Sequence, residues 1–276
     1  MKAEPLGLIA GNGRFPFLVA AAARRVGRPV VAVAIREEAA AELEGEVDQW
    51  HPVGLGQLGR CIEVLKKAGV HEAVMAGQVE HRQIFSDVVP DLKLMALLAR
   101  LAFKNTDSLI GAVAETLEAE GIRLMPSTFL LTDQMATAGA MTRQGPSRDE
   151  RKDIEYGRRI ALTLAGMDLG QTVVVKDRAA VALEAMEGTD EVIRRAGRLA
   201  GPGATVVKVA KPRQDLRFDV PVVGPGTLEA MREARALVLA LDAGKVLLID
   251  KRDFLGVAER TGVKVFGMSG GEADRG

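Results

Sequence analysis

The chain has 276 residues, and its 37 lysines and arginines balance 37 aspartates and glutamates, so the formal net charge is zero. A chain of this length is predicted to form two modest domains with a sizeable core. The even charge balance argues against nucleic-acid binding through bulk electrostatics. No apolar run is long enough to span a bilayer, so any membrane contact is expected to be peripheral.

The single cysteine, Cys61, excludes an intramolecular disulfide. The start of the chain lacks the charged, apolar and small-residue pattern of a secretory leader, so a cytoplasmic location is expected. Three histidines and one cysteine argue against a zinc cluster. Any metal ion is therefore expected to be a hard, oxygen-bound cation such as Mg²⁺.

The first half of the chain opens with a short apolar run followed by glycines. Residues 6–10 are predicted to form a strand, and Gly11-Asn12-Gly13 then leads into an alanine-rich helix that ends near Val26. In such a turn the backbone N–H groups at the helix start can face an anion. The dinucleotide-binding fingerprint is incomplete because no third glycine follows at the expected place, so a plain tight turn explains the pattern equally well.

Further strands and helices alternate along the first half. Strands are predicted at residues 29–35, 50–53, 70–76 and 121–125, and helices at 37–44, 57–68 and from about 108 to 120. This alternation predicts a parallel, Rossmann-like sheet whose ligands collect at the carboxyl ends of the strands. Gly77 and Gln78 stand at such an end, although a tight turn is the simpler explanation of the glycine.

Residues 91–104, DLKLMALLARLAFK, are predicted to form an unusually apolar helix. Its basic residues fall on one narrow stripe, and leucine, methionine and phenylalanine cover most of the remainder. The helix is too short to cross a bilayer. The pattern fits a buried core helix, a wall between domains or a lipid-facing surface.

Small and polar residues from Thr132 to Pro146 mark the predicted boundary between two domains. Beyond it, the sequence predicts a helix at 147–165, a hairpin turning at residues 176–178, a helix at 192–199, a strand at 206–209, a helix from 228 to about 243, and strands at 246–250 and 263–267. The chain is thus predicted to be a two-domain α/β protein. Residues 1–131 form an N-terminal Rossmann-like domain, 132–146 a linker or hinge, and 147–276 a smaller C-terminal catalytic α/β domain, with the active site in the cleft between them.

The segment from Val206 to Thr227 joins a buried strand to a charged continuation. In an extended chain Asp215, Arg217 and Asp219 would share one face. Such a face suits phosphate chemistry, because nearby cations can hold phosphate oxygens while carboxylates hold a divalent metal or orient a water. A salt-bridged, solvated strand face explains the same spacing.

A second group of acids precedes the helix predicted at residues 192–199. Its members surround one glycine: Glu184, Glu187, Asp190 and Glu191. Acids at a helix start are ordinarily capping residues stabilised by the helix dipole. Carboxylates gathered around a glycine also permit a metal site, so both interpretations stay open.

The charged segment carries a family resemblance. Its run QDLRFDVPVVG, residues 214–224, resembles the Gln-x-x-Arg-x-Asp-Leu-Pro-Thr-x-Gly hallmark of the LpxI family of UDP-2,3-diacylglucosamine pyrophosphatases, with Val220 and Val222 as departures. The run EAMEGTD, residues 184–190, resembles a second signature of that family. The turn at Gly11 is similar to the family's Gly-Gly-Gly-x-Leu-Pro turn, and the similarity extends over nearly the whole chain.

This resemblance implies an activity and a set of functional residues. The reaction would split UDP-2,3-diacylglucosamine into UMP and 2,3-diacylglucosamine 1-phosphate in lipid A synthesis, with Mg²⁺ or Mn²⁺. The expected catalytic residues are Asp219, Arg217 and Lys208, and the expected metal ligands are Asp219, Glu187 and Asp190. Substrate binding is expected at Gly11, Asn12, Gly13, Gly77, Gln78, Gln171, Thr189, Gln214, Gly224 and Thr227.

The expected partner is a lipid-linked nucleotide sugar. Met95, Leu98 or Phe103 would then help to line a pocket for its acyl chains. Peripheral contact with the inner membrane surface and formation of an oligomer are left open. The alternative function is non-catalytic binding of a nucleotide sugar or dinucleotide, which rests on the glycine turn at Gly11 alone.

Overall fold

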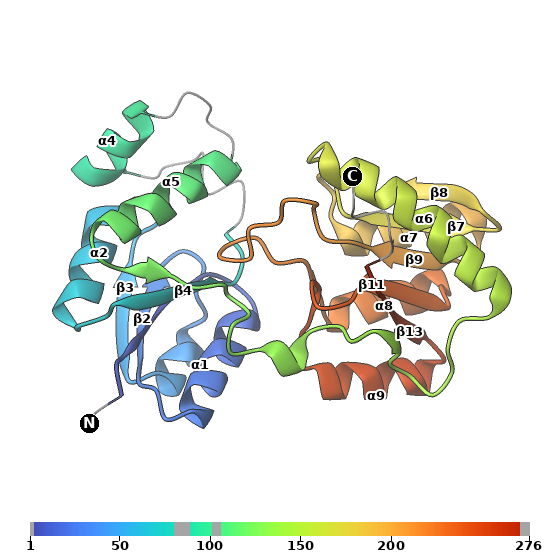
Figure 1. Cartoon of the computed structure of the whole chain (residues 1–276), viewed down its shortest axis with the longest axis horizontal. Helices are drawn as coiled ribbons and strands as arrows, with labels where there is room; N and C mark the ends of the chain where they lie inside the picture. Colours follow the sequence, from blue (N-terminus) through green and yellow to red (C-terminus); the bar gives the residue numbers. More distant parts are fainter. Residues whose placement is uncertain (1–2, 80–88, 101–105, 271–276) are drawn as a thin grey trace. The chain divides into compact units, whose positions relative to one another are not determined.

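The structure is a computed structural model that describes residues 3–79, 89–100 and 106–270 (Figure 1). The chain divides into two compact units. Unit 1 contains Met1–Leu131 and Leu216–Phe218, and unit 2 contains Thr132–Asp215 and Asp219–Gly276. Both units combine helices with a sheet, so the predicted α/β class is confirmed.

Unit 1 is built on a five-stranded sheet. Its strand order is β3 (Gln49–Val53), β2 (Val30–Ile35), β1 (Leu6–Ala10), β4 (Glu72–Ala76) and β5 (Arg123–Leu124). All neighbouring strands are parallel. All six residues of β2 are buried, as expected of a parallel strand that is covered on both faces. The predicted Rossmann-like parallel sheet is confirmed.

Helices cover both faces of this sheet (Figure 1). Helix α1 (Phe15–Arg25) packs against β1, β2 and β4. The helices α2 (Leu58–Lys67), α4 (Leu92–Arg100) and α5 (Thr106–Ala119) belong to the core that also contains Val31 and Val33. Side chains of a strand alternate between faces, so these two valines mark the face opposite α1.

Two helices of unit 1 can be compared with the predictions. Residues 37–44 were expected to be helical, whereas the structure has a 3₁₀ helix η1 (Ala41–Glu46) with Leu43 as its buried residue. One buried side chain gives too little apolar contact to stabilise a longer helix.

In α4, Leu94 and Leu97 are buried whereas Leu92 and Met95 are exposed, so one face of this helix packs in the core. Phe103 lies outside the described residues, and an acyl pocket stays a prediction.

Unit 2 contains a six-stranded mixed sheet. Its order is β6 (Gly139–Ala140), β13 (Lys264–Met268), β11 (Val238–Asp242), β9 (Thr205–Lys208), β7 (Thr172–Lys176) and β8 (Ala179–Leu183). The strands β13, β11 and β9 are mutually parallel, and β7 is antiparallel to both β9 and β8. Because β8 runs back along β7, the carboxyl ends of β8, β9 and β11 meet at one edge, where β7 begins.

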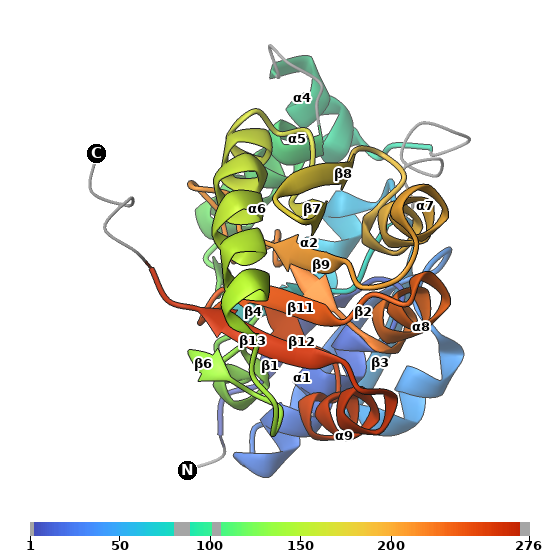
Figure 2. The same ribbon diagram turned by 90° about the vertical axis from the view of Figure 1, so that its right-hand side faces the viewer.

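Helices also cover both faces of the second sheet (Figure 2). Helix α6 (Arg148–Gly166) lies on one face, and α7 (Thr189–Ala200), α8 (Pro225–Ala234) and α9 (Lys251–Thr261) lie on the other. A Cβ atom at Gly157 of α6 would lie 2.8 Å from Val207 of β9, so this glycine permits close packing of the helix on the sheet. The remaining strands, β10 (Val222–Val223) and β12 (Leu247–Leu248), form a separate parallel pair.

The helix predicted from residue 228 to about 243 is too long. Helix α8 ends at Ala234 because Arg235 adopts a left-handed conformation with φ 51° and ψ 37°. The following residues form β11, whose five residues are all buried. A continuous run of leucine, alanine and valine fits a buried strand as well as a buried helix, so periodicity could not separate the two.

The extended conformation predicted for residues 214–220 is also wrong. The Asp219 amide donates to the carbonyl of Asp215 at 2.9 Å, which closes a helical turn. A turn does not place every second side chain on one face. Asp215, Arg217 and Asp219 therefore do not form the expected charged face.

Residues 132–146 form a short 3₁₀ helix, η2 (Thr132–Gln134), followed by strand β6, which pairs with β13. They belong to unit 2. Their role as a hinge, and the predicted domain limits, stay predictions. Within the described ranges, the structure contains no helix that combines the length and apolarity needed to cross a membrane.

Candidate functional site

A buried lysine occupies the carboxyl edge of the second sheet. Lys208 is the last residue of β9, and only 6% of its surface is exposed. Its Nζ donates to Thr189 Oγ1 at 2.6 Å and to Thr172 Oγ1 at 3.5 Å. Burial lowers the pKa of the Lys208 ammonium, and negative charge on Glu184, Asp190 and Asp219 opposes this shift. The edge thus holds a desolvated cation among three carboxylates.

Glu184 follows the end of β8 and faces this edge. Its Oε1 accepts from Thr189 Oγ1, and its Oε2 accepts from the Gln171 amide, both at 2.9 Å. Burial raises the pKa of the Glu184 carboxyl, but the charge of Lys208 and these hydrogen bonds outweigh it and hold the pKa below the ordinary value. Glu184 is therefore ionised at neutral pH.

Asp190 connects the start of α7 with the start of α8. Its Oδ1 accepts from Thr227 Oγ1 at 2.9 Å. A Cβ atom at Gly226 would lie 2.6 Å from Asp190 Oδ2, so the absence of a side chain there makes room for the carboxylate. Gly224 is the N-cap of α8. Two helix N-termini, which carry partial positive charge, thus meet at the edge that holds Lys208.

The turn after β9 carries Asp219. Asp219 Oδ2 lies 3.1 Å from Lys211 Nζ, which also pairs with Asp168 Oδ1 at 2.5 Å. Gln214 fastens this turn, because its Nε2 donates to the Asp219 carbonyl at 2.9 Å and its Oε1 accepts from the Lys211 amide at 2.6 Å. The observed contacts of Gln214 are therefore those of a residue that shapes the loop.

Asp242 anchors the beginning of the same loop and was not singled out in the sequence. It ends β11, and only 3% of its surface is exposed. Its Oδ2 accepts from the Ala210 amide at 3.1 Å, and its Oδ1 accepts from Arg158 Nε at 3.3 Å. The sequence signal for Asp242 is a charged residue at the end of an apolar strand. It was missed because residues 238–242 were predicted to be helical.

Arg217 belongs to unit 1, unlike the other two predicted catalytic residues. Its NH1 pairs with Glu118 Oε1 at 2.9 Å, and its carbonyl accepts from Ser127 Oγ at 2.8 Å. The next residue, Phe218, packs against the core of unit 1. In unit 2 the structure gathers Lys208 with Thr189, Asp190 and Thr227, and Asp219 acts on Lys208 through its charge.

The residues predicted around the first glycine turn bond to one another. The amide of Asn12 donates to the carbonyl of Gln78 at 2.7 Å, and the amide of Gln78 donates to the carbonyl of Asn12 at 3.1 Å. A Cβ atom at Gly11 would lie 2.5 Å from the Gln78 carbonyl oxygen, and one at Gly77 would lie 2.6 Å from the Asn12 carbonyl oxygen. Gly13 adopts φ 90°, a conformation suited to glycine. Close packing of two loops explains these glycines, and substrate contacts there stay a prediction.

The predicted metal ligands do not form one cluster. Throughout the part of the chain that the structure describes, no three His, Cys, Asp or Glu side chains are grouped so that they could hold a metal ion. Glu187 instead accepts from Arg195 NH2 at 2.5 Å. Asp190 and Asp219 both face Lys208, and Mg²⁺ commonly takes only one or two carboxylates and completes its shell with phosphates and water. Either carboxylate fits a cation that is bound together with a phosphorylated ligand.

Gln171 offers an unused acceptor beside this site. Its amide holds Glu184, yet its Oε1 is buried and has no hydrogen-bond partner within the described residues. A buried acceptor that lacks a partner is unfavourable. A ligand that donates a hydrogen bond would satisfy it.

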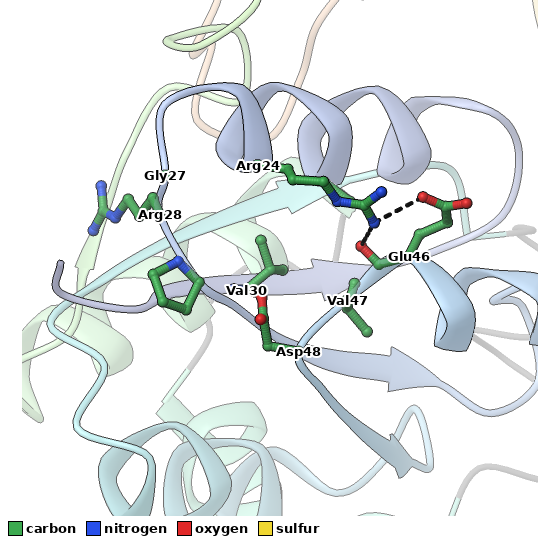
Figure 3. A pocket seen from close by; sticks show the side chains of 9 residues that line it. Arg24, Gly27, Arg28, Val30, Glu46, Val47 and Asp48 are labelled. Atoms are coloured by element: carbon green, nitrogen blue, oxygen red, sulfur yellow. Dashed lines mark hydrogen bonds and ion pairs between the residues drawn. The ribbon is translucent and has the colours of Figure 1, made fainter. Parts of the chain in front are cut away.

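A hollow of about 270 Å³ lies in unit 1, at the amino end of β2 (Figure 3). Arg24 and Glu46 line it and pair with each other at 2.9 Å. Asp48, also in the lining, accepts from the Val30 amide at 2.8 Å. Ligands of parallel sheets bind at the opposite, carboxyl ends of the strands, and these charges are already satisfied, so the hollow does not resemble a substrate site.

The fold and the surroundings of Lys208 define the class of protein. It has two α/β units, and a buried, charged site lies at the carboxyl edge of the sheet in unit 2. Residues 5–134 match the family model of the LpxI N-terminal domain, and residues 137–266 match that of the LpxI C-terminal domain. The chain belongs to the LpxI family.

A relative from Caulobacter vibrioides, described as UDP-2,3-diacylglucosamine pyrophosphatase LpxI, is 28% identical over 274 residues. The alignment covers 95% of this chain and 97% of the relative.

Similarity to solved structures is low. A biotin carboxylase domain of 2-oxoglutarate carboxylase from Hydrogenobacter thermophilus is 14% identical, with a TM-score of 0.28, over 66% of this chain and 36% of that chain. A biotin carboxylase subunit of pyruvate carboxylase is 15% identical, with a TM-score of 0.26, over 72% of this chain and 42% of that chain. At such scores no common fold follows.

Proposed function

We propose that this protein hydrolyses the pyrophosphate bond of UDP-2,3-diacylglucosamine. Water adds to one of the two phosphorus atoms, the bridging P–O bond breaks, and the products are UMP and 2,3-diacylglucosamine 1-phosphate. Membership of the LpxI family supports this assignment, as does the activity in the name of the Caulobacter relative, which aligns over almost its full length. The substrate is a lipid-linked nucleotide sugar, and the reaction belongs to lipid A synthesis.

The observation that carries the proposal in the structure is the environment of Lys208. A buried ammonium bound mainly by neutral hydroxyls favours an anionic ligand, and two helix N-termini add partial positive charge beside it. In the reaction Lys208 donates to a phosphate oxygen and stabilises negative charge as it grows in the transition state. Gln171 Oε1 accepts a hydrogen bond from the nucleotide or sugar.

Asp219 has the role of holding either the attacking water or a divalent cation. When bound, Mg²⁺ or Mn²⁺ would offset negative charge on the phosphate oxygens. Asp219 and Asp190, whose negative charge reaches Lys208, are the carboxylates that would hold such an ion. Glu187 has no part in this proposal, because it is paired with Arg195.

Release of UMP tests the proposed function. Purified protein is incubated with UDP-2,3-diacylglucosamine in detergent micelles and Mg²⁺, and UMP is quantified by chromatography. The proposal expects UMP and the sugar 1-phosphate in equal amounts. Tight binding of the substrate without release of UMP would instead support the alternative, a non-catalytic nucleotide-sugar-binding protein.

Removal of metal tests the cation separately. Treatment with EDTA should stop the release of UMP, and added Mg²⁺ or Mn²⁺ should restore it. Full activity after thorough chelation would contradict the proposed cation and leave phosphate binding to the lysine and arginine side chains.

A further inference from the structure

Lys208, Thr189 and Glu184 form a chain of hydrogen bonds with a fixed direction. Thr189 Oγ1 donates its single proton to Glu184 Oε1 at 2.9 Å. The hydroxyl oxygen is then left to accept from Lys208 Nζ at 2.6 Å. The bonds therefore run from the ammonium, through one hydroxyl, to the carboxylate.

Glu184 is held in place at both of its oxygens. While Oε1 accepts from Thr189, Oε2 accepts from the amide of Gln171 at 2.9 Å. A Cβ atom at Gly170 would lie 2.2 Å from the Glu184 carbonyl oxygen. The backbone of Glu184 is therefore also closely packed, against the residue that precedes Gln171. This rigidity fixes the hydroxyl of Thr189, and through it the ammonium of Lys208.

The indirect pairing leaves part of the ammonium available. A lysine has three N–H donors, and a direct ion pair would place a carboxylate on one or two of them. Here Thr189 takes one donor at short distance, and Thr172 lies at 3.5 Å, the outer limit of a hydrogen bond. Among the described residues these two hydroxyls are the hydrogen-bond partners of Nζ, so at least one of its N–H donors is left without an acceptor there.

We propose that Glu184 is a positioning residue for phosphate binding, which holds the buried Lys208 through the hydroxyl of Thr189 and keeps an N–H of its ammonium free for a phosphate oxygen. This inference rests on the proposed function in taking a pyrophosphate as the ligand. In this role Glu184 acts through Thr189 and Lys208, and not through contact with the substrate.

Isosteric variants test the chain of bonds. Glu184→Gln leaves one acceptor oxygen for two donors, so either Thr189 or the Gln171 amide loses its acceptor. Thr189→Val removes the hydroxyl, whereas Thr189→Ser keeps it. The matched control is Glu191→Gln in the helix that Thr189 begins, because Glu191 is exposed and pairs with Arg194 on the same helix.

Calorimetric titration with inorganic pyrophosphate provides the first readout. The dissociation constant should rise about tenfold or more for Glu184→Gln and Thr189→Val, and should change less than about twofold for Thr189→Ser and Glu191→Gln. The binding stoichiometry should stay unchanged. A lower stoichiometry with an unchanged dissociation constant would mean partial unfolding and would overturn the proposal, as would wild-type affinity in Glu184→Gln.

A double-mutant cycle with Lys208→Met provides the second readout. If Glu184 acts only through Lys208, adding Glu184→Gln to Lys208→Met should weaken pyrophosphate binding by less than about twofold. Additive losses would show that Glu184 acts independently of Lys208 and would overturn the proposal.

The outcomes separate this inference from the proposed function. Release of UMP by the wild type, combined with wild-type binding in Glu184→Gln, would keep the function and reject the positioning role. If the wild type releases no UMP, but Glu184→Gln weakens pyrophosphate binding only when Lys208 is present, the positioning role would stand and the proposed function would be rejected. A wild-type protein that does not bind pyrophosphate at millimolar concentration would reject the positioning role.

Discussion

At the scale of single residues, Asp219 carries the most specific expectation. It shares Lys211 with Asp168, since Lys211 Nζ pairs with a carboxylate oxygen of each. The two aspartates differ in that only Asp219 acts on Lys208 through its charge. This difference separates a role in the reaction from a role in fixing Lys211.

Asp219→Asn should lower the kcat for release of UMP by about a thousandfold or more, with little change in substrate affinity, because a transition-state contact is lost. Asp168→Asn is the matched control and should keep wild-type turnover, and it suits the left-handed conformation of this residue, φ 59°. Equal losses in the two variants would mean that Asp219 serves only to hold Lys211.

Cys61 provides a test of burial in unit 1 at the same scale. Burial, together with the negative charge of Asp91, raises the pKa of its thiol to about 12. Below that pH the thiol stays protonated, so at pH 8 roughly one molecule in ten thousand carries the reactive thiolate. Because the folded pKa exceeds the unfolded value of about 8.5, this group favours the native state at neutral pH, and that stability is lost as pH rises from about 8.5 to 12.

A disulfide exchange reagent at pH 8 should therefore leave the native protein unmodified for hours and modify one thiol per chain after denaturation. The control is the same reaction on free cysteine under the same conditions. Rapid modification of one thiol in the native protein would show that Cys61 is accessible, and would contradict the packing described for α2.

At the scale of elements, the start of α8 has a specific packing requirement. The carboxylate of Asp190 occupies the space that a side chain at residue 226 would fill, since a Cβ atom there would lie 2.6 Å from Asp190 Oδ2. The neighbouring Thr227 hydroxyl holds the other oxygen of the same carboxylate. Asp190 is a side chain that can rotate, so an added methyl group would move it away from Thr227 without unfolding the helix.

Gly226→Ala should consequently lower turnover by about tenfold, while the melting temperature changes little. Gly111→Ala is a suitable comparison, because a Cβ atom at Gly111 of α5 would meet nothing within 4 Å. That substitution should raise the melting temperature slightly, since alanine favours a helix over glycine by about 0.5–1 kcal/mol. Wild-type turnover in Gly226→Ala would mean that the position of Asp190 does not matter for the reaction.

Most elements could be predicted from local patterns. The strand of residues 6–10, the glycine turn and the following helix were recognisable because an apolar run, glycines and an alanine-rich pattern follow each other directly. Strand β11 was not recognisable, because its run of leucine, alanine and valine has no periodicity that distinguishes strand from helix. The turn at 215–219 was missed because its alternating charges mimic a strand, whereas tertiary contacts determine its conformation.

The candidate site was predictable to the extent that sequence neighbours form it. Lys208, Thr189 and Asp190 stood in recognisable runs, and the structure brings them to one edge of a sheet. The role of Thr172 depends on pairing across the sheet, where it lies opposite Lys208. Such pairing joins residues that are far apart in the sequence, and no local pattern records it.

At the scale of the whole molecule, neither unit is a single continuous stretch of the sequence. Leu216–Phe218 comes from the second half of the chain but belongs to unit 1. There the backbone amide of Ser127 donates to the Leu216 carbonyl at 2.8 Å, and Phe218 packs against the core. A division of the sequence at one boundary cannot show this exchange. The charged segment therefore contributes Arg217 to one unit and Asp219 to the other.

The central claim is that the buried ammonium of Lys208 supports hydrolysis of a pyrophosphate bond, and its most direct test is the rate of UMP release from UDP-2,3-diacylglucosamine by wild type and Lys208→Met. The account predicts that the wild type releases UMP and that the variant loses about a hundredfold or more in kcat/KM, because a charged donor to the transition state is removed. Lys152→Met is the control and should retain activity, because Lys152 is a half-exposed lysine of α6 that pairs with Asp149. A folded Lys208→Met variant with wild-type kcat/KM, or a wild type that releases no UMP, would contradict the account.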